Sequence, residues 1–299
     1  MDKMDIDELK EAGKITKKII DQLEGLVIVG ASYKDVAETI EDMIADEGAK
    51  PTFPVNISVN DITAHDTPDK DDERVFTEND LVKVDFGIWL NNAFTDVART
   101  IDLSGKYAKL VSTAERALDN AVEAIKPGVK VGDIGGIIED TIKKEGLKPI
   151  VNLTGHKMEP LMLHAGVEIP NIKTSDPYEF EVGDVFAVEP FVTTGDAKGY
   201  VKETEDVRIF SLLFPKQPRM RHTRKLLSFI VENYLSMPFA ERWLYKAIDS
   251  KLMLHSAIKE LLKMKVLEAY PVLVEASGKP VAQMETNVVV TEEGCERIV

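Results

Sequence analysis

Residues 78–98 read ENDLVKVDFGIWLNNAFTDVA. Apolar residues rich in Val, Ile and Phe lie on both sides of Asn91 and Asn92, and they predict two strands over Leu81–Leu90 and Ala93–Ile101. Asparagine tolerates the positive φ that a tight hairpin turn requires. The sequence therefore predicts a β-hairpin whose turn is the Asn-Asn pair.

Two aspartates lie within this hairpin, one on each strand. If the Asn-Asn pair forms the turn, Asp85 faces Ala98 and Asp96 faces Gly87. Residues two apart share a face of a strand, so the two aspartates are diagonal neighbours on one side, with Cβ atoms roughly 7–8 Å apart or less. The hairpin therefore places two carboxylates in the same space, among apolar neighbours.

A second stretch of the chain resembles the first in character. Residues 182–189 read VGDVFAVE, and residues 78–85 read ENDLVKVD, so each has turn residues, an Asp, apolar residues and then a carboxylate. Two unrelated buried strands that follow turns would look similar. The more specific interpretation is a duplicated α+β unit in which one acid from each half meets the other at the middle.

Two glutamates, Glu189 and Glu285, lie in similarly apolar surroundings. Several buried carboxylates repel one another unless cations neutralise them. No Lys or Arg lies within three residues of either glutamate. A divalent metal is the economical explanation for four such acids. The alternative is that they pair with Lys or Arg side chains distant in sequence.

Three histidines lie among small or polar residues and are candidate ligands or substrate contacts. His156 follows Thr154 and Gly155, His164 precedes an Ala-Gly pair, and His65 precedes an Asp. A single histidine of this kind is more often structural than catalytic. Two of the chain's five histidines, His156 and His164, lie within nine positions.

Periodicity predicts the remaining elements. Apolar residues at three- and four-residue steps indicate packing helices, with Ser32 as a plausible N-cap of the second. Val, Ile and Phe enrichment indicates strands. The expected helices are Asp7–Gly25, Ser32–Gly48, Ala114–Ile125 and Asp133–Lys144, and the further strands are Val185–Val192, Pro271–Glu275 and Val281–Val290.

The composition favours a soluble globular protein of the cytoplasm. The chain has 299 residues, 44% of them hydrophobic, and 37 Lys+Arg against 52 Asp+Glu give a net charge of −15. One cysteine, Cys295, excludes an internal disulfide framework and a Cys-rich zinc site. No apolar run approaches the ~20 residues of a membrane-spanning helix, and the acidic N-terminus is unlike a signal peptide.

One segment is basic within this acidic chain. Residues 209–268 hold 11 Lys+Arg and 5 Asp+Glu, a net charge of +6, which leaves −21 for the remainder. Leu226, Leu227, Ile230 and Tyr234 fall at helical spacing. We expect a small helical insertion at 209–268 in a catalytic domain formed by 1–208 and 269–299. Its cations are either simply solvated or approach an anionic surface such as a ribosome.

Taken together, these motifs resemble those of the methionine aminopeptidases. The resemblance covers essentially the whole chain, and the basic insertion is similar to that of the type 2 class of archaea and eukaryotes. It implies an α/β (α+β) "pita-bread" fold with pseudo-twofold duplication and a dinuclear metal centre. The quoted motifs are Asp85 and Asp96 with ten residues between them, Thr154-Gly155-His156, His164-Ala165-Gly166, Val188-Glu189-Pro190 and Met284-Glu285-Thr286.

The resemblance also implies a role for each site residue. Asp85 would chelate one metal, and Asp96 would bridge to the other. His156 and Glu189 would complete the second metal, and Glu285 would bridge both. The remaining matches would face the substrate: His65 and His164 as polar contacts, and Phe53 and Leu163 as walls of the methionine pocket.

The implied activity is hydrolysis of the N-terminal methionine from peptides and nascent chains, with a preference for small penultimate residues. Glu189 would relay the proton, His164 would stabilise the oxyanion, and His65 would hydrogen-bond the substrate backbone. Two divalent ions, Mn²⁺, Fe²⁺, Co²⁺ or Zn²⁺, would be the cofactors of a protein that we expect to be monomeric. The alternatives are a proline dipeptidase-like hydrolase and a non-catalytic relative that binds RNA or the ribosome.

Overall fold

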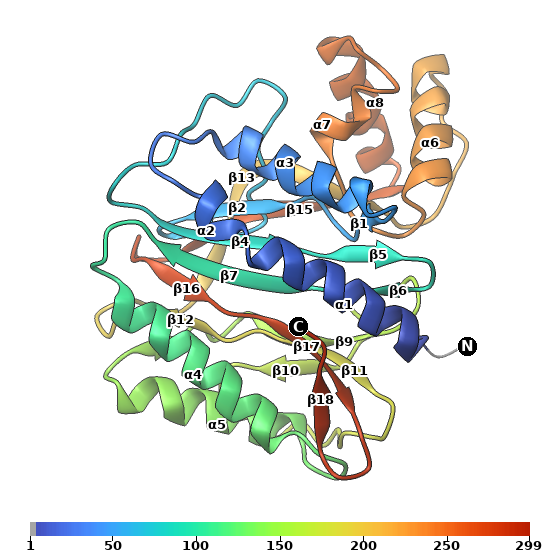
Figure 1. The fold of residues 1–299 in the computed structure, drawn as a ribbon. Helices are drawn as coiled ribbons and strands as arrows, with labels where there is room; N and C mark the ends of the chain where they lie inside the picture. The colour runs from blue at the N-terminus through green and yellow to red at the C-terminus, as the bar shows by residue number, and fades with distance from the viewer. Residues whose placement is uncertain (1–3) are drawn as a thin grey trace.

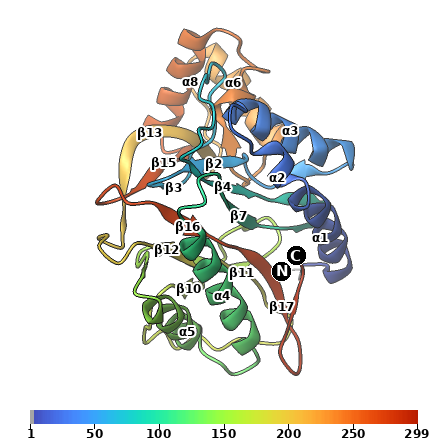
Figure 2. The ribbon, with the colours of Figure 1, turned by 60° about the vertical axis from the view of Figure 1, so that its left-hand side comes forward.

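Two halves of similar build make up most of the molecule in the computed structural model, which describes residues 4–299 (Figure 1). Helices α1 (Ile6–Ile20) and α3 (Tyr33–Asp46) belong to the first half, and α4 (Ala108–Ala124) and α5 (Val131–Lys144) belong to the second. Each half has its own cluster of buried apolar side chains. The strands run through the middle of the molecule between the two sets of helices (Figure 2).

The central strands have the same antiparallel order in both halves. In the first, β4 (Leu81–Phe86) lies between β2 (Asn56–Val59) and β7 (Val97–Asp102). In the second, β11 (Val185–Val188) lies between β9 (Thr154–Met158) and β17 (Thr286–Val290), and the sheet extends to β10 (Glu168–Pro170) and β18 (Cys295–Arg297). This shared order agrees with the predicted duplication.

The turns before β4 and β11 are built alike. The side chain of Asp80 accepts a hydrogen bond from the backbone N–H of Thr77 at 2.7 Å, and that of Asp184 accepts one from Glu181 at 3.0 Å. Each Asp thus satisfies the N–H group three residues before it, immediately ahead of a buried strand. The similarity between residues 78–85 and 182–189 is therefore reproduced in three dimensions.

The predicted hairpin has the expected register. Asp85 on β4 faces Ala98 on β7, and Asn91 in the turn has a φ of 53°. The predicted strands are not continuous, however. They divide near Gly87 and Asp96 into β4 and β5 (Ile88–Leu90), and into β6 (Ala93–Phe94) and β7. A Cβ atom on Gly87 would lie 2.1 Å from the carbonyl oxygen of Thr95, so only glycine permits this close approach.

The strands of the second half divide in the same way. The predicted strand at 185–192 breaks at Glu189 and Pro190 into β11 and β12 (Phe191–Thr193), and that at 281–290 breaks at Met284 and Glu285 into β16 (Val281–Gln283) and β17. Proline has no N–H for the ladder, so a break at Pro190 follows from its chemistry. Glu189 and Glu285 therefore lie where strands pass from one sheet to the next.

The helix predictions are right in place but inexact in length. The predicted helix at 7–25 ends at Ile20 and is followed by the short α2 (Leu23–Leu26). Helix α4 begins at Ala108, six residues before the predicted start. Ser32 caps α3 as expected, because its side chain accepts a hydrogen bond from the N–H of Asp35 at 3.3 Å.

A helical segment lies between two long strands, β13 (Val201–Leu212) and β15 (Leu267–Glu275), of which β15 begins four residues before the predicted Pro271. It contains α6 (Arg221–Asn233), α7 (Glu241–Leu244) and α8 (Lys251–Lys263), which stand apart from the two halves in Figure 1. These helices share an apolar cluster of their own. Leu226, Leu227 and Ile230 lie on α6 as predicted, where they are buried, and Tyr234 caps its end.

The remaining strands are short and join the sheets at their edges. They are β1 (Lys50–Pro51), β3 (Ile62–Ala64), β8 (Lys148–Pro149) and β14 (Phe239–Ala240). Strand β3 pairs with β15, and thereby joins the first half to the strand that leaves the helical segment. Within residues 4–299, no helix combines the length and apolar character needed to cross a membrane.

Candidate active site

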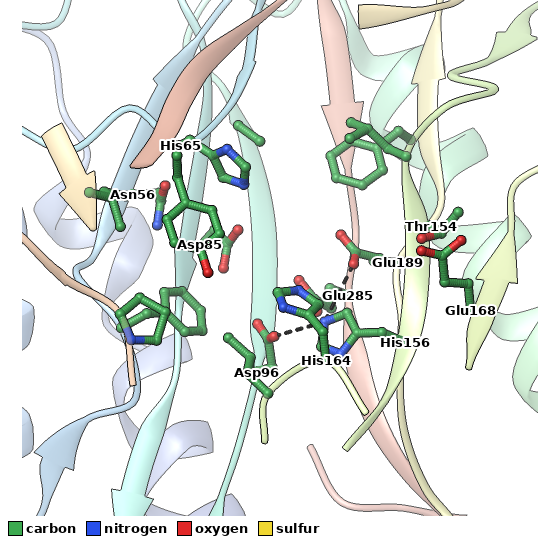
Figure 3. Close-up of a pocket in the computed structure, with 18 of the residues that line it drawn as sticks. Asn56, His65, Asp85, Asp96, Thr154, His156, His164, Glu168, Glu189 and Glu285 are labelled. Carbon is green, nitrogen blue, oxygen red and sulfur yellow. Dashed lines mark ion pairs between the residues drawn. The ribbon is translucent and has the colours of Figure 1, made fainter. Parts of the chain in front are cut away.

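One cavity of about 270 Å³ is lined by all five residues proposed as metal ligands (Figure 3). Asp85, Asp96, His156, Glu189 and Glu285 come from five different strands or strand breaks, and span 200 residues of sequence. Figure 3 shows Asp85 on one side, Glu189 and His156 on the other, and Asp96 and Glu285 between them. The acids of the two halves therefore converge on one space.

Backbone hydrogen bonds between the halves fix the central acids. The N–H of Asp96 donates to Oδ1 of Asn287 on β17 at 2.8 Å. The N–H of Glu285 donates to the carbonyl oxygen of Ala98 on β7 at 3.1 Å. Each central acid is thus held by a residue of the other half, at the point where its own strand has left the ladder.

The polar atoms of the centre approach one another closely. Nε2 of His156 lies 3.2 Å from Oδ2 of Asp96 and 3.7 Å from Oε1 of Glu189. Asp96, His156 and Glu285 each place one potential ligand atom within 4.8 Å of the other two. All three residues are buried. A single cation can be reached by one nitrogen and several oxygens here.

Burial and mutual repulsion disfavour the charged carboxylates. Burial raises the pKa of Asp85, Glu189 and Glu285 well above the ordinary values, and the negative charge of Asp96 raises it further. In the part of the chain that the structure describes, His156 pairs with Asp96 and Glu189, and no Lys or Arg side chain forms an ion pair with any of the four carboxylates. The alternative of distant Lys or Arg partners is therefore not supported.

The donor set fits a divalent cation. Oδ1 of Asp85 and Oε1 of Glu285 are buried atoms without a hydrogen-bond partner in the protein. A buried oxygen without a partner is costly, and several such oxygens around a cavity are the arrangement that a hard or borderline metal ion satisfies. Four carboxylates and one imidazole would hold two divalent ions with no net charge left over.

His65 and His164 line the same cavity outside this cluster. Nδ1 of His65 lies 3.1 Å from the carbonyl oxygen of Pro271, and burial lowers the pKa of its imidazole. The rings of His164 and His156 have centroids 4.2 Å apart. His164 opens to the cavity, but the surrounding protein lowers its pKa to about 4, and His156 contributes to that shift. Both imidazoles are therefore neutral near pH 7.

The walls of the cavity include the two apolar residues singled out from the sequence. Phe53 is buried and Leu163 is partly exposed at the wall. Sequence reasoning missed several further apolar or aromatic wall residues, which carry no motif of their own. They are Phe191, Ile209, Pro238 and Tyr270.

Sequence reasoning also missed polar residues beside the acids. Nε2 of Gln283 lies 3.3 Å from Oε2 of Glu285 and 3.5 Å from Oε2 of Glu189. Asn56 faces Asp85 in the register of β2 and β4 and lines the cavity. The signal for Gln283 was its spacing, because a residue two positions before Glu285 on an extended chain points to the same side. Asn56 carried no such signal.

Solved structures with low sequence identity to this chain have a similar fold. A crystal structure of a methionine aminopeptidase from Thermotoga maritima matches with a TM-score of 0.71 at 22% identity, over 98% of this chain and 95% of that one. A thermophilic Arx1 matches with a TM-score of 0.82 at 20% identity, over 99% and 91%. A prolidase from Pyrococcus furiosus matches with a TM-score of 0.63 at 19% identity, over 98% of this chain but 63% of the prolidase.

Comparisons of the amino-acid sequence find relatives that are more similar than these solved structures. A methionine aminopeptidase of Archaeoglobus fulgidus is 44% identical, and the match covers 96% of each chain. One of Methanothermobacter thermautotrophicus is 40% identical over 97% of each chain. The model of metallopeptidase family M24 matches residues 7–213. This chain has the predicted pita-bread fold and belongs to metallopeptidase family M24, among the methionine aminopeptidases.

Proposed function

We propose that this protein removes the N-terminal methionine from peptides and nascent chains as a type 2 methionine aminopeptidase, with a preference for small penultimate residues. The observation that carries the proposal is the cavity in which four acids and His156 meet without a Lys or Arg partner among residues 4–299. The archaeal relatives and the helical segment before Glu285 support the type 2 assignment.

Two divalent ions would be held by Asp85, Asp96, His156, Glu189 and Glu285. When bound, divalent ions activate water near neutral pH and offset the charge of the surrounding carboxylates. Oxygen-rich ligation with one imidazole suits Mn²⁺, Fe²⁺ or Co²⁺ at least as well as Zn²⁺. The protein's part is to hold these side chains at fixed positions before substrate arrives.

The cavity residues divide the remaining work. Glu189, whose pKa is raised by burial, accepts and passes on the proton of the attacking water. His164 is neutral, so it donates an N–H hydrogen bond to the carbonyl oxygen as negative charge develops there. His65 hydrogen-bonds the substrate backbone. Phe53 and Leu163 line the pocket for the methionine side chain.

The helical segment has a separate proposed role. Residues 209–268 carry a net charge of +6 against −21 for the catalytic domain of 1–208 and 269–299. We propose that this segment contacts the anionic surface of the ribosome in the cytoplasm, where new chains emerge. Co-sedimentation with ribosomes that is lost as salt increases would support this, because exposed charges are screened at high ionic strength. Since one chain supplies the whole cavity, we expect a monomer by light scattering.

A peptide panel tests the proposed activity and its cofactor together. The protein should release methionine from Met-Ala-Ser peptides, leave peptides with a large penultimate residue largely intact, and lose activity after chelation. Adding Mn²⁺ or Co²⁺ should restore it. Cleavage of dipeptides ending in proline, without cleavage of Met-Ala-Ser, would instead support the prolidase-like alternative. Ribosome binding without any cleavage would support the non-catalytic alternative.

A further inference from the structure

The residue His65 has an unusual backbone conformation at the edge of the cavity. Its φ is 64°, in the left-handed region that only a few per cent of non-glycine residues adopt. Such a conformation costs of order 1–3 kcal/mol and persists only where surrounding contacts impose it. His65 follows β3, and the residues after it do not continue the strand. The contacts that hold residues 66–68 therefore fix the imidazole's direction together with its contact to the carbonyl oxygen of Pro271.

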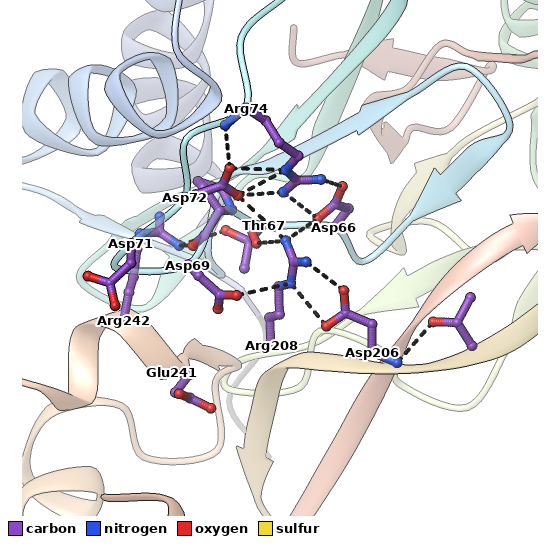
Figure 4. A network of polar contacts seen from close by, with 12 residues as sticks. Asp66, Thr67, Asp69, Asp71, Asp72, Arg74, Asp206, Arg208, Glu241 and Arg242 are labelled. Carbon is purple, nitrogen blue, oxygen red and sulfur yellow. Dashed lines mark hydrogen bonds and ion pairs between the residues drawn. The ribbon is translucent and has the colours of Figure 1, made fainter. Parts of the chain in front are cut away.

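Asp66 is the first of these anchors (Figure 4). Its side chain is 1% exposed and accepts hydrogen bonds from Arg74 at 2.7 Å and from Arg208 on β13 at 2.9 Å. Its carbonyl oxygen accepts the N–H of Ile57 on β2 at 2.7 Å. Two guanidinium groups and a neighbouring strand thus fix the residue immediately after His65.

Arg242, on α7 of the helical segment, provides the second anchor. Its Nη1 donates to Oγ1 of Thr67 at 2.6 Å and lies 3.3 Å from the carbonyl oxygen of Pro68. Its Nη2 donates to Glu41 on α3. Thr67 in turn donates its hydroxyl hydrogen to the carbonyl oxygen of Val55 at 2.8 Å.

This guanidinium is a bridge between three parts of the fold. The side chain of Arg242 is 3% exposed, and the same Glu41 also accepts a hydrogen bond from Nε1 of Trp243 at 2.9 Å. A planar fork donates in two directions at once, to Thr67 and to Glu41, which a lysine ammonium on a flexible stem does not reproduce. Arg242 therefore fastens the chain after His65 to the body of the first half.

We propose that Arg242 is a positioning residue for His65, so that the helical segment supports the chemistry of the cavity as well as carrying positive charge. The proposal rests on the proposed function, in which His65 contacts the substrate. Arg242 lies outside the residues that line the catalytic cavity and acts through Thr67. Removing the guanidinium would release Thr67 and Pro68 and leave Asp66 as the remaining anchor, so the backbone at His65 would be held less firmly in its left-handed conformation.

A double-mutant cycle on Met-Ala-Ser peptides tests this. We expect Arg242→Met to lower kcat/KM about 10- to 100-fold with bound metal unchanged, since a misplacement of about 1 Å costs as much as 100-fold. In a His65→Ala background the same change should lower kcat/KM less than about twofold, because the effects of substitutions at interacting residues do not add. An equal loss in both backgrounds, or no loss in either, would overturn the proposal.

Two further variants keep this test decisive. If Arg242→Met does not fold, Thr67→Val removes the hydroxyl that accepts from Arg242 and donates to Val55, and it should show the same dependence on His65. The matched control is Arg224→Met, because among residues 4–299 Arg224 donates only to the carbonyl oxygens of Pro218 and Arg219, within the helical segment. The control should keep kcat/KM within about twofold of the parent, as expected for a surface substitution.

An NMR titration separates this proposal from the proposed activity. The imidazole pKa of His65 is lowered by burial, so a loosened chain should let it rise toward its ordinary value in the Arg242→Met protein. If the pKa rises but the wild-type protein does not cleave Met-Ala-Ser, the proposed function is contradicted and the positioning of His65 by Arg242 is still supported. An unchanged His65 signal and pKa would contradict that positioning, whatever the activity.

Discussion

The two halves of the molecule share a backbone plan but differ in what they place at equivalent positions. Asp85 faces Ala98 between β4 and β7. In the second half, β11 pairs with β17, and continuing that register by one step sets Glu189 opposite Glu285. The acid at the end of the middle strand is therefore common to both halves, whereas its partner is a small residue in one half and an acid in the other.

The strand on the other side of each middle strand shows a second difference. In the second half, His156 on β9 faces Ala187, whose small side chain leaves room for the imidazole. The equivalent pair in the first half is Ser58 and Lys83. Nζ of Lys83 is buried and donates to the carbonyl oxygens of Asn60 at 3.1 Å and Val281 at 2.8 Å. The strand order of the two halves is thus the same, whereas the side chains at equivalent positions differ in chemistry.

The largest expected effect follows from removing one acid from either half. We expect Asp85→Asn and Glu285→Gln each to lower kcat at least about 1,000-fold with the fold preserved, because each removes a negative charge that the metal centre needs. Assays with added Mn²⁺ or Co²⁺, with circular dichroism for the fold, check this. Glu296→Gln is the control, since Glu296 forms an exposed ion pair with Lys10. Near-normal rates for either variant would refute the convergence of the halves.

The histidines outside the cluster should have a smaller and different effect. We expect His65→Ala and His164→Ala to lower kcat/KM about 100-fold, the usual cost of losing a hydrogen-bond donor to the reacting group. Metal content measured by atomic emission should stay near that of the parent. Loss of metal from these variants would mean that they are ligands rather than substrate contacts.

Two hydrogen bonds between the halves should differ in whether they support metal binding or stability. Asn287 accepts the N–H of Asp96 at 2.8 Å, and Thr100 accepts the N–H of Gln283 at 2.8 Å. We expect Asn287→Ala to weaken metal binding about 10-fold or more, because residues behind ligands commonly contribute that much. Thr100→Val should chiefly cost stability, about 1–3 kcal/mol, since it leaves buried backbone groups without a partner.

Calorimetric metal titration and urea unfolding of the two variants measure these effects. We expect metal affinity to fall only for Asn287→Ala, and stability to fall for Thr100→Val. Equal losses of metal affinity would show instead that Thr100 supports the centre as directly as Asn287 does.

The last prediction concerns Lys83, whose effect is on stability alone. Burial lowers the pKa of its amine to about 7 from 10.5, so between these pH values the unfolded chain binds more protons than the folded one. Stability should therefore rise with pH across this window, by up to about 1.4 kcal/mol per pH unit, relative to a Lys83→Met protein. Urea unfolding at pH 7, 8.5 and 10 measures it. A stability difference that is independent of pH would contradict a neutral amine in the folded protein.

Much of the fold was predictable from local pattern. The turn at Asn91, the register of Asp85 and Ala98, and the Ser32 cap depend on neighbours in sequence, and all three agree with the structure. The division of the strands near Asp96 and at Glu189 was not predicted, because an apolar strand and one that passes to another sheet have the same composition.

The candidate site was predictable to a similar extent. The five proposed ligands stood out as acids or imidazoles in apolar or small-residue contexts, and they line one cavity. Gln283 was indicated only by its spacing from Glu285, and Asn56 by nothing, because a neutral amide carries no sign of what it faces. The link from Arg242 to Thr67 spans 175 residues, and no local pattern indicates such a contact.

Anomalous diffraction from crystals grown with Mn²⁺ or Co²⁺ tests the central claim most directly. We predict two strong peaks per chain in the cavity, with carboxylate oxygens of both halves and Nε2 of His156 around them. A cavity without peaks at saturating metal, or one whose carboxylates bind arginine or lysine side chains instead, would contradict the account.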